Sequence, residues 1–363
     1  MKSWKYGWLV SLTVLSLFLS GCLLGSKNES SSQAIDPPQE DYLTSDEIEF
    51  EFDEGMEEEG SEEKSSVDKK GEKGEEQAGT KLVDRTIYVF DHEGHVVPLT
   101  IKVPHTEGVA KQALEYLVVD GPVTDQLPDG MRAVLPAGTE MTVKIEGNTA
   151  VVDFSPEFKN YHPDDEKGIL EAITYTLTEF ENIDQVKIMI NGYMQETMPV
   201  KGTPINQPLS RKDGINLEIA EGTQIGNSSL VTLYFLAQNP SGQFDYFVPV
   251  TRLIPKTDDL IKATVEQLQA GPQFGSGLYS LFSDELKLVQ TALEKETAVL
   301  HFAQPAGEEK TKDELLSKEA LDALVLSLTE LSPVEKVQVT VEGSGENRSQ
   351  AVSRPSEVNV ASF

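Results

Sequence analysis

The sequence has few of the residues that build disulfides, metal centres and basic surfaces. It contains one cysteine and five histidines in 363 residues, so an intrachain disulfide and a cysteine-based zinc cluster are excluded and a histidine metal site is disfavoured. Lysine and arginine number 30 against 61 aspartates and glutamates, a formal net charge of −31. A chain of this charge repels phosphate, which excludes a general binder of nucleic acid or of anionic membranes.

The N-terminus carries a short apolar run. Lys2 and Lys5 precede WLVSLTVLSLFL at 8–19, the pattern of a secretory signal, whereas a membrane span needs roughly 20 apolar residues. The run ends in LSGC at 19–22, which resembles a bacterial lipobox. We therefore expect a lipoprotein signal peptide at 1–21 and lipidation of Cys22, the single cysteine; the alternative is a plain signal peptide with an incidental cysteine. Two acyl chains on that residue would suffice for stable anchoring.

Residues 22–80 are predicted to form the lipidated cysteine and a disordered acidic tether. Between positions 40 and 79 there are 17 acids and four lysines, with no sustained apolar period. Such a segment buries too little apolar surface to offset the entropy of ordering. As a flexible coil it would span ~45 Å, extended further by charge repulsion, and would hold the folded part away from the lipid.

The folded part carries two copies of one domain. TAVVDF at 149–154 recurs as TAVLHF at 297–302, and the stretch at 172–193 aligns without gaps to 323–344, 151 residues later. Gly-Pro and Val/Ile-Pro pairs keep the same order, so the period indicates a domain duplication. The predicted boundaries are 85–198 for the first domain, 199–229 for a packed connection, 230–345 for the second domain and 346–363 for a C-terminal tail.

Each copy has the pattern of a small α+β domain. In the first copy, β-branched and alternating residues predict strands at 86–90, 96–103, 141–145, 150–154 and 186–190, and Pro98 marks an edge or a bulge. Apolar spacing predicts helices at 107–118 and 164–180, with Asp164, Asp165 and Glu166 expected to cap the second. The order favours an α/β sandwich, a mostly antiparallel sheet with both helices on one face, in two tandem copies.

Two segments outside these elements are candidate contact surfaces. The loop at 121–138 holds three prolines, three glycines and several apolar residues, so it either covers the end of the sheet or meets a partner. In the connection, a basic cluster either pairs with acids of the same chain or binds an acidic partner or wall polymer. The candidate contacts are Leu127, Pro128, Met131, Arg132, Leu135, Lys201, Arg211 and Lys212.

The sequence contains no convincing active site. His92 and His95, in the turn DHEGH, do not have the spacing that places two zinc ligands on one helix face, and we expect a turn of solvated polar residues. Glycine-serine clusters lack the lysine of a phosphate-binding loop. No catalytic, cofactor-binding or metal-binding residue is predicted.

The blocks in this order resemble the GerMN family, the sporulation-and-spore-germination domains of Bacillus-type bacteria. The resemblance rests on the lipobox, the acidic tether, KQALEYLVVDGPV at 111–123, MRAVLPAGT at 131–139 and GTPINQPLSRKDGINLE at 202–218. The second copy departs at 271–283, where the LPxG core of the loop is missing. The family implies a membrane-anchored protein of the developing spore envelope, associated with a channel-like complex between mother cell and forespore. It also implies domains similar to the ring-building motifs of secretion systems.

Three classes of function compete. The main hypothesis is a non-enzymatic assembly protein, lipid-anchored on the extracytoplasmic face between the mother-cell and forespore membranes, with proteins of the channel complex as partners. The alternative is binding of peptidoglycan or cortex, for which Tyr161, Tyr193, Tyr234 and Tyr246 are candidate groove residues. A wall hydrolase is disfavoured because no metal or carboxylate constellation is found.

Overall fold

The computed structural model describes residues 81–282, 286–303, 316–342 and 350–360. The predicted signal peptide, Cys22 and the acidic tether lie outside these residues. The described residues belong to one compact unit that starts at Glu75. Within them, no helix combines the length and the apolar character that crossing a membrane requires.

The first copy begins with a long hairpin and continues into a four-stranded sheet. The hairpin is antiparallel, and the sheet has the order β3-β4-β5-β6, in which β4 and β5 are parallel because α2 crosses over between them. The elements are β1 (Leu82–Phe90), β2 (Val96–Pro104), α1 (Val109–Glu115), β3 (Met141–Glu146), β4 (Thr149–Phe154), α2 (Glu166–Leu177), β5 (Gln185–Ile190) and β6 (Tyr193–Met194). Short 3-10 turns lie at η1 (Thr124–Gln126), η2 (Pro156–Lys159) and η3 (Pro163–Asp165).

The second copy repeats this plan. Its sheet has the order β10-β11-β12-β13, again with a parallel central pair. The elements are β8 (Ser228–Gln238), β9 (Asp245–Pro255), α3 (Leu260–Ala270), β10 (Lys287–Glu294), β11 (Thr297–Ala303), α5 (Lys318–Leu328), β12 (Lys336–Glu342) and β13 (Val352–Ser353). The connection between the copies holds η4 (Arg211–Asp213) and β7 (Glu218–Ile219), and β7 joins the second hairpin beside β9.

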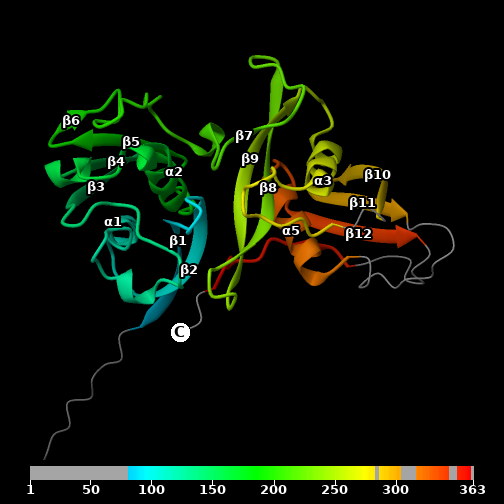
Figure 1. Ribbon diagram of the computed structural model, residues 1–363, viewed down its shortest axis with the longest axis horizontal. Helices are drawn as coiled ribbons and strands as arrows, with labels where there is room; N and C mark the ends of the chain where they lie inside the picture. The colour runs from blue at the N-terminus through cyan, green and yellow to red at the C-terminus, as the bar shows by residue number, and fades with distance from the viewer. Residues whose placement is uncertain (1–80, 283–285, 304–315, 343–349, 361–363) are drawn as a thin grey trace, which may run out of the picture. The chain divides into compact units, whose positions relative to one another are not determined.

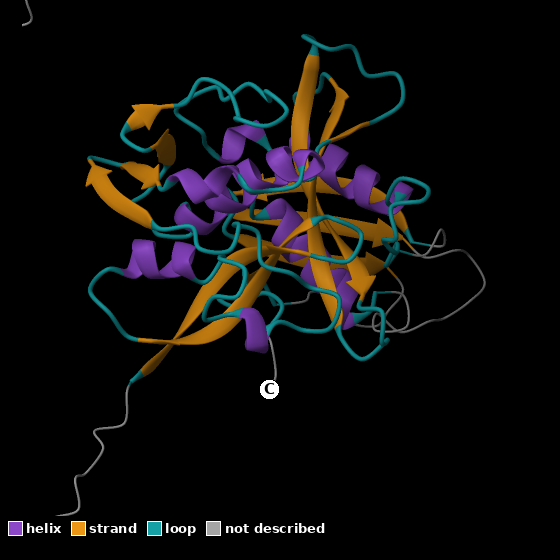
Figure 2. Cartoon of the chain, turned by 60° about the vertical axis from the view of Figure 1, so that its left-hand side comes forward, coloured by secondary structure: helices purple, strands orange, loops and turns teal. Residues whose placement is uncertain are grey.

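The helices of each copy lie between the hairpin and the four-stranded sheet (Figure 1). Helix α2 packs on β1 and on β5, and α5 packs on β8 and on β12, an arrangement that the side view also shows (Figure 2). The expectation of helices on one face of a single sheet was therefore incomplete. The physical reason is visible in α2, where every residue from Ile169 to Leu177 is buried, so the helix needs cover on both sides.

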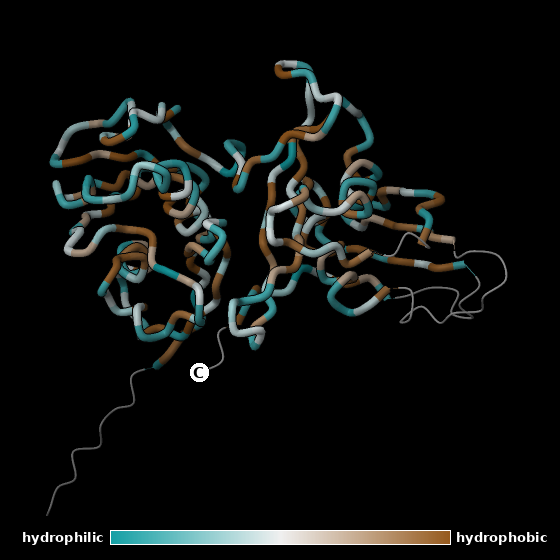
Figure 3. Tube along the Cα trace, in the orientation of Figure 1, coloured by the Kyte–Doolittle hydropathy of each residue, from teal (hydrophilic) through white to brown (hydrophobic). Residues whose placement is uncertain are grey.

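The core follows the strand alternation that the sequence predicts. On β4 and β5, buried and half-buried residues alternate, and Phe154, Val186 and Ile188 point into the interior. Hydrophobic segments follow the strands and helices, while the turns are hydrophilic (Figure 3). In each hairpin, the strand that contacts the other copy is called the outer strand; it is β2 in the first copy and β9 in the second. Each outer strand carries a proline, Pro98 on β2 and Pro249 on β9. The edge position predicted for Pro98 is confirmed, since a residue without an N–H group suits a strand edge.

Candidate interaction surface

The acidic start of α2 holds the beginning of the connection between the copies. The carboxylate of Glu166 is buried and accepts hydrogen bonds from the Tyr161 hydroxyl (2.8 Å) and from the N–H groups of Val200 (3.0 Å), Lys201 and Thr203 (3.1 Å). Burial alone would raise the pKa of Glu166, but the N–H groups of Lys201 and Thr203 and the Tyr161 hydroxyl lower it from 4.5 to about 2. The ionised carboxylate is therefore the form that holds the connection.

Two neighbouring carboxylates bring the two predicted contact segments together. Asp165 binds both terminal nitrogens of Arg132 (2.8 and 3.1 Å), and Asp164 binds Nζ of Lys201 (2.9 Å). The guanidinium of Arg132 also lies over the Phe90 ring, 4.1 Å from its centroid. Asp165 occupies the N-cap position of α2 but makes no side-chain capping bond, so the expectation that these acids cap the helix was wrong. They bind basic side chains of the loop and of the connection instead.

The loop at 121–138 divides into core and surface. Leu135 is fully buried and bridges to Val118 beside α1, so its assignment as a partner contact was wrong: the core already occupies its side chain. Leu127 and Met131 are partly buried against the same core, and Pro128 is half-buried. The first of the two alternatives, that the loop covers the end of the fold, accounts for most of its apolar residues. Arg132 is the exposed member of the set.

Arg211 and Lys212 do not bind the acids at the start of α2. Arg211 binds the carboxylate of Glu179 and stacks on Tyr175, with 4.7 Å between the guanidinium carbon and the ring centroid. Lys212 is exposed at the rim of a hollow that Arg211 also lines. For Arg211, as for Lys201, pairing with acids of the same chain is the alternative that the structure supports.

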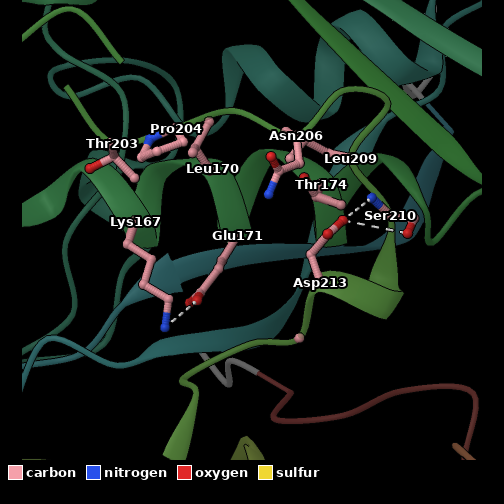
Figure 4. Close-up of a pocket in the computed structure, with 11 residues that line it drawn as sticks. Lys167, Leu170, Glu171, Thr174, Thr203, Pro204, Asn206, Leu209, Ser210 and Asp213 are labelled. Atoms are coloured by element: carbon pink, nitrogen blue, oxygen red, sulfur yellow. Dashed lines mark hydrogen bonds and ion pairs between the residues drawn. The ribbon is translucent and has the colours of Figure 1, made fainter. Parts of the chain in front are cut away.

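A hollow lies between α2 and the connection. Lys167 and Glu171 lie on its α2 side, 3.3 Å apart, and Asp213 on its other side binds Ser210 (Figure 4). Burial raises the pKa of Glu171, although Lys167 opposes the shift. The hollow has a volume of about 230 Å³, less than the roughly 300–1,000 Å³ typical of small-molecule sites. Its carboxylates have partners within the chain, so its geometry supports no catalytic role.

The turn at Asp91–His95 is more ordered than a solvated loop. Asp91 is buried and accepts bonds from the N–H of His95 (2.8 Å), from the His95 ring (3.1 Å) and from the hydroxyl of Tyr246 (3.1 Å). Burial would raise the pKa of Asp91, but the bonds from His95 and Tyr246 lower it overall. Because Tyr246 lies on β9, this turn contacts the second copy. In the described part of the chain, no cluster of three or more His, Cys, Asp or Glu side chains is placed to hold a metal ion.

The tyrosines considered for glycan binding do not form a groove. Tyr234 and Tyr246 are buried in the second copy, and Tyr161 is partly buried with its hydroxyl on Glu166. Tyr193 alone among the four is strongly exposed, at 73%. Stacking on sugars needs open aromatic faces, so the aromatic basis of the carbohydrate hypothesis is lost.

The two-copy plan matches known proteins along most of the chain. The family model described as Germane, sporulation and spore germination, matches residues 86–196 and 232–346. The chain belongs to this family. It is 42% identical over 361 residues to the spore germination protein GerM of Bacillus subtilis (strain 168), with 96% of each protein covered. The solved structure of the tandem GerMN domains of that sporulation protein has a TM-score of 0.71 and 44% identity, and it covers 78% of this chain and 100% of that one. The chain is thus a GerM homologue with two tandem GerMN domains and a role in sporulation or germination.

Sequence reasoning missed Asn216 and Asn359, which join the copies, and Arg354, which matches Arg211. Each asparagine bridges two strands, and each arginine binds a glutamate at the end of a helix of its own copy. The signal that could have found them is a further repeat block, RKDGIN at 211–216 and RPSEVN at 354–359. Its offset is 143 residues and not 151, because the spacing between the last strand and this block differs between the copies.

Proposed function

We propose that this GerMN protein is a membrane-anchored, non-enzymatic assembly protein of the spore envelope, and that it supports the channel complex between mother cell and forespore. Family membership supplies the sporulation role. The observation that carries the assembly role is the fixed pairing of two like domains, which orients two four-stranded sheets in advance. Pre-orientation lowers the ordering cost of docking on a partner. Lipidated Cys22 and the acidic tether are proposed to place these sheets within reach of the complex, between the two membranes.

The contact is proposed to run along a sheet edge. In the part of the chain that the structure describes, β3 and β10 each form one end of their sheet, and the opposite ends are the two-residue strands β6 and β13. β3 carries the exposed ion pair Lys144–Glu146, a charged feature that discourages pairing with another chain. β10 exposes two large apolar side chains, Val289 (57%) and Leu293 (44%), whereas β3 exposes Ile145 alone (40%). An edge with exposed apolar side chains suits strand addition by a partner protein, which makes β10 the preferred contact.

The test is capture of partners from sporulating cells with the full lipidated chain. We expect the wild type to capture a defined set of envelope membrane proteins. Val289→Lys with Leu293→Lys should lose them, because two charges would be placed along the proposed contact. Ile225→Lys is the matched control, since Ile225 is 84% exposed in a loop away from β10. Unchanged capture by the β10 variant, or capture of glycan strands in place of proteins, would contradict the proposal.

The anchor is tested separately. Cys22→Ala should abolish sedimentation with membranes and leave the folded domains intact, because a diacylated cysteine supplies the two chains that stable anchoring takes. The measurement is fractionation of cells with an antibody against the folded part, beside thermal unfolding of the purified variant. Continued sedimentation of the variant with its signal peptide removed would show that another feature anchors the chain.

A further inference from the structure

Each GerMN copy is followed by an arm of the same design. The first arm is 211–219 and the second is 354–360. Arg211 binds Glu179 at the end of its own copy's α2, and Arg354 binds Glu330 at the end of its own copy's α5, at 2.8 Å. The two glutamates are 151 residues apart, the offset of the gap-free repeat. Each arm is therefore attached to its own copy in the same way.

The tyrosines beneath these pairs repeat as well. Tyr88 donates its hydroxyl to Glu179 (2.8 Å), and its N–H group binds the hydroxyl of Thr176 (3.0 Å). In the second copy, Tyr234 donates to Glu330 (3.0 Å), and its N–H group binds the hydroxyl of Ser327 (2.9 Å). Both tyrosines are buried, so the two attachments have matching cores.

The asparagine of the first arm joins the outer strands of the two hairpins. The side-chain oxygen of Asn216 accepts from the N–H of Val96 on β2 (2.9 Å). Its amide nitrogen donates to the carbonyl of Val96 (2.8 Å) and, across the boundary between the copies, to that of Pro249 on β9 (2.7 Å). The residue has a φ of 48°, a left-handed conformation that asparagine tolerates better than most side chains.

The asparagine of the second arm makes the same three bonds with the copies exchanged. Asn359 accepts from the N–H of Phe247 on β9 (2.7 Å) and donates to its carbonyl (2.8 Å). It also donates across the boundary to the carbonyl of Pro98 on β2 (2.8 Å). Its φ is 53°. Val96 and Phe247 are 151 residues apart, as are Pro98 and Pro249, so each of the three side-chain bonds of Asn216 has its counterpart at Asn359.

The strands of the arms are exchanged in the same direction, since each runs parallel to the strand that it joins. In the first arm, β7 pairs in parallel with β9 of the second copy, with Glu218 opposite Arg252 and Ile219 opposite Leu253. In the second arm, Val360 lies opposite Thr100 on β2 of the first copy, also in parallel. The backbone bonds of the two arms differ by one position: the N–H of Thr251 binds the carbonyl of Ile215, whereas the N–H of Thr100 binds the carbonyl of Asn359. Each copy therefore receives the arm of the other.

We propose that this face is a two-fold association surface of the GerMN domain itself, and that its partner is a second GerMN domain carrying its own arm. In a two-fold interface, residue i of one partner contacts residue j of the other and the reverse contact is also made, which is the pattern of both arms. The prolines give a reason for the arm. Pro98 on β2 and Pro249 on β9 have no N–H group to donate. The asparagine amides donate hydrogen bonds to the carbonyl groups at these two positions. This inference does not depend on the envelope role.

The first experiment uses the full chain with a protease site inserted in the exposed turn at 221–226, between β7 and β8. Cleavage leaves an arm on each half. Two cleaved preparations, which differ in the affinity tag on the first half, are mixed and one tag is captured. We expect the halves to stay associated in each cleaved preparation, and exchange in the mixture to bring differently tagged first halves together as like pairs. Recovery of first halves with second halves alone, or separation of the halves on cleavage, would overturn the proposal.

The second experiment tests reciprocity in the cleaved chain. Asn216→Ala and Asn359→Ala should each weaken the association of the halves by about 10- to 100-fold, the loss expected when buried backbone groups lose their partners. The two effects should agree within about threefold, because the two sets of bonds correspond and context varies by a factor of this order. Asn191→Ala is the control, since Asn191 has a φ of 50° but lies in the exposed turn between β5 and β6. Unequal losses at 216 and 359 would mean that the interface is not two-fold.

Discussion

Glu166 shows how one side chain can serve a purpose that its position in the sequence does not reveal. An acid in the first turn of a helix normally complements the helix dipole. In this fold the carboxylate turns to the chain that leaves the first copy and accepts N–H groups of Val200, Lys201 and Thr203. The segment that meets Glu166 lies more than thirty residues later, so no local pattern could have indicated it.

Glu166→Gln is expected to destabilise the folded domains by about 1–3 kcal/mol, because the amide places N–H groups against backbone N–H donors. The pKa of Glu166 is lowered on folding to about 2, so the ionised carboxylate favours the folded state. This contribution is fully present above the usual glutamate pKa and is lost as the pH falls towards 2. Urea unfolding between pH 7 and pH 3 should therefore show a difference between wild type and variant that shrinks with acid. Glu181→Gln, at an exposed position, is the control; a difference independent of pH would contradict the assignment.

Among the elements, strands and helices were predicted well because their signal is local. Each strand and helix predicted in the first copy is present, with ends that differ by a few residues, such as Glu166–Leu177 for the helix expected at 164–180. The layer order was predicted less well. The placement of a hairpin on one side of the helices and a sheet on the other depends on contacts that are distant in the sequence. The one local feature that reflects it is α2, which is buried on all sides. The contact surface was predicted least well, because Leu135 in a proline-rich loop looks the same whether it is covered or open.

The connection behaves as an element of the core over part of its length. Ile205, Leu209 and Ile215 are buried, as a packed connection requires, whereas Leu217 and Ile219 remain exposed. Ile215→Ala should cost about 2–4 kcal/mol, since it removes a fully buried side chain and leaves a cavity. Ile219→Ala, at a side chain that is 49% exposed in β7, should change the free energy of unfolding little. The measurement is the denaturant midpoint of each variant. Equal losses of unfolding free energy in the two variants would show that the connection is not ordered as described.

At the scale of the whole molecule, the exchanged arms make the two domains one folding unit. Tandem domains move independently by default unless a large contact joins them. In this chain each domain completes the outer strand of the other's hairpin. We therefore expect a chain that starts at Lys81 to unfold in denaturant in one transition, with a slope that reflects the whole folded surface. Two separated transitions, each with the midpoint and slope of an isolated half, would show that the copies are independent.

The second arm also determines when folding of the first domain can be completed during synthesis. The hydroxyl of Thr100 binds the carbonyl of Val358, a partner 258 positions later in the chain. At a synthesis rate of about 5–20 residues per second, the first hairpin waits roughly 13–52 s before the residues that complete its outer strand exist. During that time the proline-bearing edge of β2 lacks its arm. The duplication that gives this protein a paired architecture thus also means that its first domain is complete only when the second domain and its arm have been made.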